Sequence, residues 1–450
     1  MKVPEWLPEP NRPHRAGGGH GKTPVERLTR PVARFMEIEA AGGIVLLVCT
    51  LAAIAIAQTA ARTEFEAIWQ MRVGLAFGPL ELFKPLRLWI NDGLMTIFFF
   101  VVGLEIKAEF VRGELRDPRK AAAPVAAALG GMLAPAAIYL ALQWNQPGER
   151  GWAIPMATDI AFVVGFMALL GRRVPFNLKI LLLTLAIVDD LGAVLVIAAA
   201  YTDQIALGML GLSVAGFAVV FLLNKIGVRA IGVYVVIGAG IWLAFLKSGI
   251  HPTVAGVLLG VMTPASAWFE RRSLMRVTAG VARQLQIDEE QDEPEHLDDA
   301  VSVLATTARE TVAPLDRLQT ALHSWTAFII MPLFALANAG VAFQPSQLQE
   351  PITWSVAAGL VIGKPLGIML LTWLAVAVGL ARLPEGVSWK ALFGGAALAG
   401  IGFTMSLFIA GLALSGDALS AGKLGTMIGS GASAVLGCAW LLYAGRRGAA

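Results

Sequence analysis

Asp189 and Asp190 stand side by side in the middle of a long apolar run, at 176–200. A charge at the centre of a bilayer costs at least about 2.5–3.5 kcal/mol, so two carboxylates there require a reason. Adjacent helix positions point about 100° apart, so one carboxylate can face a salt-bridge partner while the other faces a cavity. If both face a polar interior, they titrate as a coupled set. The structural alternative is a single carboxylate that joins two helices.

Thr158 and Asp159 lie in a second apolar run, at 152–170, shortly after Pro155. Proline removes a backbone donor and clashes with the preceding turn, so an interruption of the helix is predicted here. Unwound backbone would leave carbonyls free beside the hydroxyl and the carboxylate, and hard cations favour such oxygen ligands. The alternative is a simple proline kink with a buried, protonated aspartate.

Lys364 lies ten residues into a third run, at 354–379, too deep to reach the surface easily. A buried lysine either loses its proton or pairs with a carboxylate. A purely structural ion pair is the alternative, and it does not exclude a functional one. Three carboxylates and one ammonium leave a formal charge of −2, which protons or metal cations must offset. Both compete for the same oxygens, so the charges predict a proton/cation exchange site that binds metal better as pH rises.

The elements that position these residues follow from composition. The 450-residue chain is 56% hydrophobic and 15% charged, with a mean hydropathy of +0.68, whereas soluble domains are about 25% charged. This excludes a disordered chain and an ordinary soluble enzyme, and the net charge of +3 gives no support to nucleic-acid binding. Cys49 and Cys438 both lie in apolar runs, so neither a disulfide framework nor a thiolate metal site is expected.

An all-α membrane protein is predicted, because lipid cannot satisfy exposed backbone groups and about 20 apolar residues span a bilayer as a helix. Twelve runs qualify, near 38–59, 90–106, 121–142, 152–170, 176–200, 205–224, 231–246, 250–263, 324–343, 354–379, 391–414 and 424–443. The connection 65–88 alternates apolar and polar residues around Gly78-Pro79 and is predicted to form a hairpin.

The distribution of basic residues predicts the orientation. Of the 35 Lys and Arg residues, 27 lie in the N-terminal arm, the even-numbered loops and the C-terminus, and 7 lie in the odd-numbered loops. Both termini are therefore expected in the cytoplasm. No cleavable signal peptide is expected, because residues 1–37 are polar and rich in Pro and Gly.

Two segments differ from the membrane domain of 38–450. The arm at 1–37 is expected to be disordered. Residues 264–322 form a cytoplasmic insertion between spans eight and nine, basic and amphipathic from Trp268 to Gln286 and then acidic. The basic part is suited to an anionic lipid surface. A solvated linker and a regulatory or partner-binding segment both remain open for the insertion.

Span eleven contains a cluster of helix breakers, Gly394, Gly395, Gly400 and Gly402, followed by Phe403–Ser406. Spans four and eleven hold comparable places when the chain is divided into spans 3–5 and 10–12. This pattern is typical of inverted repeats in which two interrupted helices cross at the midplane.

The chain resembles the NhaA family of bacterial sodium/proton antiporters from about Met36 to Tyr443. The stretches that carry the resemblance are Asn91–Met95, Val102–Lys107, Ala157–Phe162, Leu185–Gly192, Leu246–Gly249, Leu333–Val341, Gly363–Gly367 and Gly400–Ser406. Eight motifs in the same order are a specific match, whereas a lone Asp-Asp pair would be weak. The resemblance implies twelve helices with two interrupted helices, here spans four and eleven.

The resemblance also implies roles for individual residues. Asp190 matches the family's principal cation-binding and proton-carrying aspartate, and Asp189 its neighbour, which pairs with the lysine at Lys364. Asp159 matches the aspartate that offsets facing positive helix ends. Thr158 matches a proposed ligand, so Asp190, Asp189 and Thr158 are the implied Na⁺ or Li⁺ ligands. The remaining implied roles are the acidic funnel residues Asp92 and Glu105, and pH sensing by His323 and Glu109.

The family exports Na⁺ or Li⁺ for more than one proton, so the implied activity is electrogenic, pH-activated antiport across the bacterial inner membrane. The implied partners are Na⁺, Li⁺, H⁺, the lipid bilayer and a second copy of the chain, bound through 65–88. No cofactor, enzymatic activity or catalytic residue is implied. Of the family's pH-sensing cluster of Glu and His before span nine, this chain keeps only His323.

Three other functions compete with antiport. An intramembrane aspartyl protease needs two aspartates on facing helices that share a proton, whereas Asp189 and Asp190 are neighbours on one helix. A cation channel keeps a selectivity filter that is usually multiplied by symmetry, and the single asymmetric cluster argues against it. A related carrier of an organic substrate is the closest rival, and the lack of an evident aromatic pocket favours a bare cation.

Overall fold

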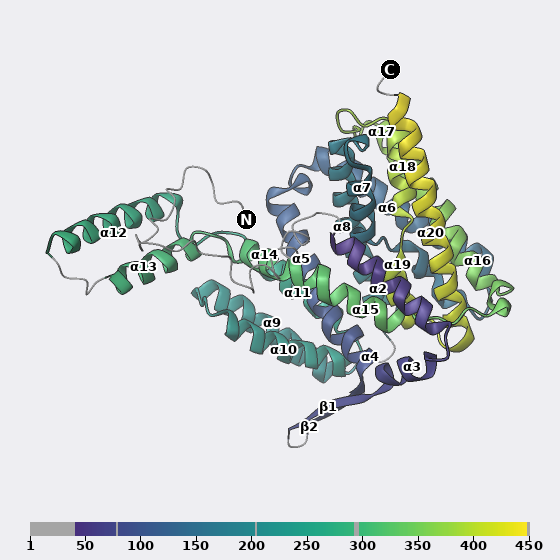
Figure 1. Cartoon of the computed structure of the whole chain (residues 1–450), viewed down its shortest axis with the longest axis horizontal. Helices are drawn as coiled ribbons and strands as arrows, with labels where there is room; N and C mark the ends of the chain where they lie inside the picture. The colour runs from purple at the N-terminus through teal and green to yellow at the C-terminus, as the bar shows by residue number, and fades with distance from the viewer. Residues whose placement is uncertain (1–40, 78–79, 203–204, 292–296, 448–450) are drawn as a thin grey trace, which may run out of the picture.

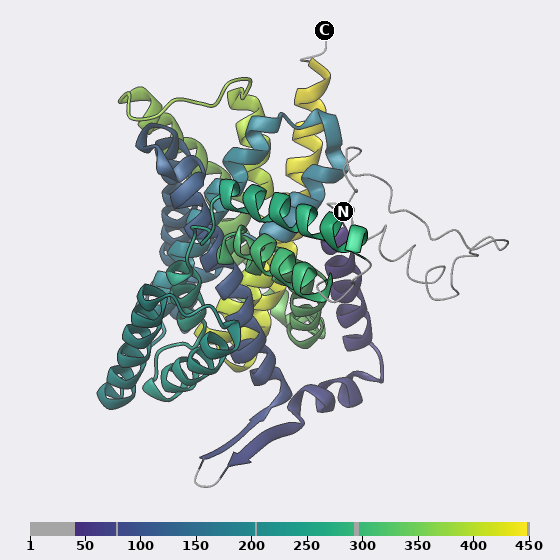
Figure 2. The same ribbon diagram turned by 90° about the vertical axis from the view of Figure 1, so that its left-hand side faces the viewer.

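The computed structural model describes residues 41–77, 80–202, 205–291 and 297–447. These residues are almost wholly helical, and most of the helices pack side by side in one bundle (Figure 1). A two-stranded hairpin and a pair of helices project from the bundle (Figure 1), and the side view shows the projection of the hairpin again (Figure 2). The predicted arm at 1–37 lies outside the described residues.

The first part of the chain contains the hairpin and two long helices. Its elements are α2 (Ala41–Ala57), α3 (Arg62–Gln70), β1 (Arg72–Phe77), β2 (Leu80–Pro85), α4 (Leu86–Leu88), η1 (Trp89–Leu94), α5 (Met95–Arg112), η2 (Glu114–Arg116) and α6 (Pro118–Gln143). The strands β1 and β2 pair antiparallel, from Arg72 opposite Pro85 to Phe77 opposite Leu80. The hairpin predicted within 65–88 is therefore confirmed.

The middle of the chain carries the aspartates. Its elements are η3 (Glu149–Met156), α7 (Ile160–Leu170), η4 (Gly171–Arg173), α8 (Phe176–Ala200), α9 (Leu207–Ile226), α10 (Ile231–Ser248) and α11 (Thr253–Met262). Helix α9 ends at Gly227, whose φ of +88° suits the left-handed position that commonly follows a helix. Most residues of α9 and several of α10 are exposed in this chain, as expected for helices at the lipid-facing edge of a bundle.

The insertion at 264–322 is largely helical. It contains α12 (Arg271–Gln291), α13 (Leu297–Glu310) and the start of α14 (Pro314–Trp325), and α12 packs against α13. Arg229, in the turn after α9, fixes the base of this projection. Its guanidinium lies 3.2 Å from the Glu310 carboxylate and 4.7 Å from the centre of the Trp268 ring. The insertion is thus attached to the α9–α10 turn through charged and aromatic contacts.

The last part of the chain carries Lys364 and the glycine cluster. Its elements are η6 (Thr326–Ile330), α15 (Met331–Asn338), η7 (Pro345–Leu348), α16 (Pro351–Ala358), η8 (Gly359–Gly363), α17 (Lys364–Ala377), α18 (Trp389–Ala399), α19 (Phe403–Ala413) and α20 (Gly416–Arg447). The final span was predicted from 424, and this boundary is wrong, because α20 begins at Gly416. The first turns of α20 contain polar residues that hydropathy does not assign to a membrane helix.

The prediction of an all-helical, multi-pass membrane protein is confirmed. Each of the twelve predicted ranges is mostly helical. By length and apolarity, eight of the described helices can cross a membrane, or up to ten if each of two bent pairs is one span. The number twelve and the inverted repeat remain predictions.

Glycines let α6 and α17 approach each other closely. A β-carbon on Gly130 would lie 2.0 Å from the carbonyl oxygen of Gly367, and one on Gly367 would lie 1.9 Å from that of Gly130. Small residues allow such backbone contact between membrane helices. Because Lys364 is the first residue of α17, this contact helps to fix its position beside α6.

Candidate functional site

Asp189 and Lys364 form a fully buried ion pair. The Lys364 ammonium donates to Asp189 Oδ2 at 2.7 Å, and the two side chains are 0% and 1% exposed. The same ammonium donates to the Thr158 hydroxyl, also at 2.7 Å. Three segments far apart in the sequence, α8, α17 and the break before α7, therefore meet at one lysine. The predicted pairing of Lys364 with a carboxylate is present.

Asp190 differs from its neighbour, although both are buried. Within the described part of the chain, neither carboxylate oxygen of Asp190 has a hydrogen-bond partner. The charged groups that act on it electrostatically are Asp189, Glu105, Asp159 and Lys364. The adjacent carboxylates thus occupy two environments. Asp189 is paired with an ammonium through Oδ2, although its Oδ1 has no hydrogen-bond partner among the described residues, whereas Asp190 can take up a proton or a cation.

Asp159 lies between two helix N-termini. Its Oδ1 accepts from the backbone N–H of Phe162 at 3.4 Å and so caps α7. Its Oδ2 accepts from the backbone N–H of Thr404 at 3.0 Å, in the first turn of α19, and from the Thr404 hydroxyl. Helix N-termini carry partial positive charge, so this carboxylate offsets two of them at once. This placement is the one that the resemblance implied.

The two predicted interruptions are present and contact each other. Residues 157–159 separate η3 from α7, and residues 400–402 separate α18 from α19, which are bent by 46°. The backbone N–H of Asp159 donates to the Ile401 carbonyl at 2.7 Å, and the Thr158 hydroxyl donates to the Ala399 carbonyl at 3.0 Å. Both carbonyls belong to span eleven, so the two breaks hold each other through hydrogen bonds. Free carbonyls in the break of span four remain a prediction.

Hydroxyl groups that the sequence reasoning did not assign support the crossing. Ser406 donates to the Ile154 carbonyl at 2.7 Å, and Ser430 of α20 accepts from the backbone N–H of Phe403 at 3.2 Å. Thr404 was quoted only as part of a motif, and its bond to Asp159 was missed. The available signal was a pair of hydroxyl residues directly after a glycine break, where backbone groups need new partners.

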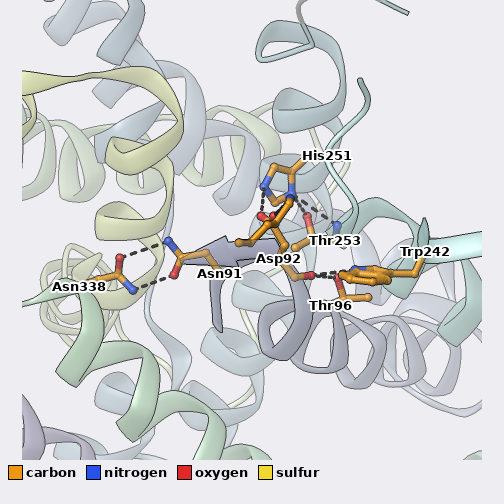
Figure 3. A network of polar contacts seen from close by, with 8 residues as sticks. Asn91, Asp92, Thr96, Trp242, His251, Thr253 and Asn338 are labelled. Atoms are coloured by element: carbon orange, nitrogen blue, oxygen red, sulfur yellow. Dashed lines mark hydrogen bonds and ion pairs between the residues drawn. The ribbon is translucent and has the colours of Figure 1, made fainter. Parts of the chain in front are cut away.

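The two predicted funnel residues lie in different places. Glu105 of α5 is half-buried, and its charge acts electrostatically on Asp190. Asp92 belongs to a separate polar network, in which Lys84 lies 2.7 Å from its carboxylate. The His251 ring lies 3.8 Å from the same carboxylate (Figure 3). Of the two residues, Glu105 is therefore the one whose charge acts on Asp190.

The two predicted pH-sensing residues are not joined by a described contact. Glu109 accepts from the Thr184 hydroxyl of α8 at 3.1 Å and from the backbone N–H of Glu114 at 2.9 Å. His323 lies on α14 and is exposed. Glu109 thus connects α5 with the helix that carries the aspartate pair, whereas His323 stands at the surface.

Known proteins resemble this chain over most of its length. The model of the Na⁺/H⁺ antiporter 1 family matches residues 33–441. The chain belongs to this family. The Na⁺/H⁺ antiporter NhaA of Rhodopirellula baltica is 47% identical over 420 residues, which are 93% of this chain and 95% of that protein. The NhaA of Rhizobium meliloti is 47% identical over 416 residues (92% and 95%), and the NhaA 2 of Vibrio vulnificus is 44% identical over 424 (93% and 94%).

The resemblance drawn from eight motifs is confirmed by this membership in an antiporter family, whose members are transport proteins. In chemical terms, the site offers one carboxylate without a hydrogen-bond partner among the described residues, beside one carboxylate paired with an ammonium, with hydroxyls and helix N-termini around them. Such a site is suited to holding a small cation or a proton.

Proposed function

We propose that the protein is a secondary antiporter that exports Na⁺ in exchange for protons at a single site around Asp190. The observation that carries this proposal is the buried carboxylate of Asp190, whose two oxygens have no hydrogen-bond partner among the described residues. An unpaired buried charge costs several kcal/mol, so the group must hold a proton or a cation. Each displaces the other from the same oxygens, and this competition is the basis of exchange.

Asp189 and Thr158 can bind the cation only after the Lys364 ammonium has moved away from them. Both side chains accept hydrogen bonds from the Lys364 ammonium in this structure. A cation shared by Asp189, Asp190 and Thr158 would lie next to that ammonium, and the like charges repel. We therefore assign Asp190 as the first ligand, with Asp189 and Thr158 completing the site as the ammonium moves away.

The same charges account for electrogenic, pH-activated transport of Na⁺ and Li⁺. The three carboxylates carry a formal charge of −3 against +1 from Lys364, so more than one proton is needed to neutralise the site, whereas Na⁺ brings a single charge. A net charge then crosses the membrane in each cycle. Because the deprotonated carboxylates are the ligands, cation affinity is low at acid pH and rises as protons leave.

The setting is the inner membrane of a bacterium, with both termini in the cytoplasm. The support is the excess of Lys and Arg in the N-terminal arm, the even-numbered loops and the C-terminus. The proton gradient supplies the driving force without a cofactor. The β1–β2 hairpin projects from the bundle (Figure 2), and we assign it to contact with a second copy of the chain.

Fluorescence dequenching of a pH-sensitive dye in everted membrane vesicles tests the exchange. Respiration first establishes the proton gradient, and NaCl, LiCl or KCl is then added between pH 6.5 and pH 9. Dequenching by Na⁺ and Li⁺ but not K⁺ is expected, rising with pH. Asp190→Asn removes the exchangeable charge and should abolish it. The matched control is Asp417→Asn, which changes an exposed aspartate in the first turn of α20.

Two outcomes would contradict the proposal. Wild-type exchange in Asp190→Asn would show that another group carries the cation. Absence of dequenching by any cation, in protein that is folded and inserted, would show that the cargo is not an alkali cation.

A further inference from the structure

Lys423 of α20 is a buried lysine that plays no part in the ion site. It is 9% exposed, and its ammonium donates to the backbone carbonyl of Asn338 at 2.8 Å. Asn338 is the last residue of α15. The last carbonyls of a helix lack partners within the helix and carry partial negative charge. Lys423 therefore caps α15 from a different helix with a charge-assisted hydrogen bond.

The side chain of Asn338 extends this contact towards the hairpin. Its amide N–H donates to Asn91 Oδ1 at 2.8 Å, and the Asn91 amide donates back at 3.3 Å (Figure 3). Asn91 directly precedes Asp92, whose backbone carbonyl accepts from the Trp242 indole at 2.9 Å and whose carboxylate pairs with Lys84 of β2. The network thus connects α15 with η1 and α10.

An aromatic cluster packs against the His251 ring of this network. Phe408 of α19 packs against Phe99 and Phe334, with ring centres 5.8 and 6.1 Å away, and against the His251 ring at 5.2 Å. Phe408 follows Thr404 by four residues, so both lie on one side of α19. Helix α19 therefore contacts both sites. Thr404 binds Asp159 of the ion site, and Phe408, one turn later, packs against His251 of the network around Asp92.

The contacts described above join two groups of helices. On one side are α19 and α20, which pack against each other and carry Thr404, Phe408 and Lys423. On the other side are α5, η1, α15 and the residues before α11. A carrier with one site opens it to each face in turn by moving one set of helices against the other. To connect the ion site with the side of Asp92, α19 and α20 must separate from the second group.

We propose that Lys423 is a positioning residue for this movement: its bond to the α15 carbonyl holds the outer side closed, and breaking the bond accompanies opening. The proposal rests on the proposed antiport and orientation. Lys84, near Asp92, and Lys423 both lie outside the predicted cytoplasmic loops, so the network is on the face opposite the chain termini. The aromatic cluster supplies non-directional packing, while the ammonium supplies a directional bond that is either made or broken.

Lys423→Met tests the proposal because methionine keeps the unbranched chain and removes the charge. Loss of a hydrogen bond to a charged group displaces the equilibrium between the two conformations by about tenfold. The apparent affinity of a ligand is reduced by the fraction of protein in the competent conformation. The cytoplasm-open fraction falls and the outward-open fraction rises, so the two half-saturating Na⁺ concentrations change in opposite directions.

The measurement is Na⁺-dependent exchange in everted and right-side-out vesicles, which present the cytoplasmic and the outer face respectively. The ratio of the half-saturating Na⁺ concentrations, cytoplasmic over outer, is expected to rise about tenfold in Lys423→Met. Lys423→Arg keeps the charge and should retain the wild-type ratio. Lys390→Met changes an exposed lysine and should also leave it unaltered.

We call Lys423 a latch if its bond holds the outer side closed. A change of the two half-saturating Na⁺ concentrations in opposite directions distinguishes a latch from a lysine that only stabilises the fold. If both half-saturating concentrations change by the same factor, or neither changes, the latch is refuted while the antiport stands. If wild-type protein exchanges no Na⁺ in either orientation, the proposed function fails, and the latch fails with it. Should Lys423→Met not fold, Lys423→Gln keeps a neutral donor and must give a smaller shift in the same direction; an unchanged ratio there refutes the latch equally.

Discussion

Replacement of Lys364 by methionine should destabilise the protein strongly, and the structure sets the magnitude. The ammonium and the Asp189 carboxylate lie 2.7 Å apart with almost no exposure. At an effective dielectric constant of about 20, two unit charges at this distance attract by about 6 kcal/mol. Part of this energy is offset by the cost of removing both charges from water. Deletion of one partner from a buried pair typically costs about 3–5 kcal/mol, because the remaining charge is left uncompensated.

A double-mutant cycle isolates this pair. Lys364→Met leaves Asp189 as a lone buried carboxylate, Asp189→Asn leaves Lys364 as a lone buried ammonium, and the double variant removes both charges. The double variant should therefore be more stable than Lys364→Met, with a coupling free energy of about 3 kcal/mol or more. The same cycle applied to the exposed pair Arg112–Asp316, with nitrogen and oxygen 2.6 Å apart, should give less than about 1 kcal/mol.

The assay measures unfolding of each purified variant in the same detergent, by denaturant titration and by the apparent Tm. The scan rate is kept fixed because unfolding can be irreversible, which makes Tm depend on it. A Lys364–Asp189 coupling as small as that of the exposed pair would refute the reasoning. It would mean that water or another group satisfies Asp189 when the lysine is absent, so that the site is wetter than the contacts indicate.

Two further predictions concern packing and assembly. Gly367→Val should prevent a stable fold, because a β-carbon there would lie 1.9 Å from the Gly130 carbonyl oxygen. Gly411→Val is the control, because a β-carbon at Gly411 meets no atom within 4 Å. The yield of monodisperse protein in detergent is compared for the two variants, and equal yields would contradict the close α6–α17 contact. Deletion of residues 72–85 should halve the mass of the detergent-solubilised protein if the hairpin joins two copies, and light scattering measures this. An unchanged dimeric mass would place the interface elsewhere.

The chemistry of the site could be predicted from the sequence because charge in an apolar run is costly. Asp159, Asp190 and Lys364 stand out against their neighbours without any knowledge of the fold. The two interruptions were also predictable, since Pro155 and the glycines at 400 and 402 disfavour a continuous helix. Their contact follows only the general pattern of broken helices in carriers.

Other parts of the site could not be predicted from local patterns. Lys423 follows three small or polar residues at the edge of an apolar run, so hydropathy assigned it to a loop, whereas it is buried inside α20. The Thr404–Asp159 contact joins residues 245 positions apart. Neither residue type nor spacing specifies such a pair, because the partner is decided by which helices pack together.

The sequence by itself determined which residues need compensation, because the cost of burying a charge depends on the residue and on the apolar length around it. The tertiary structure alone decided how each is compensated. Helix geometry requires Asp189 and Asp190 to point in different directions, but it does not say which one meets the lysine. Close packing of α6 against α17 helps to place Lys364 beside Asp189, and Asp190 is left without a hydrogen-bond partner among the residues that the structure describes. This difference between Asp189 and Asp190 depends on which helices pack together, so no single run of residues determines it.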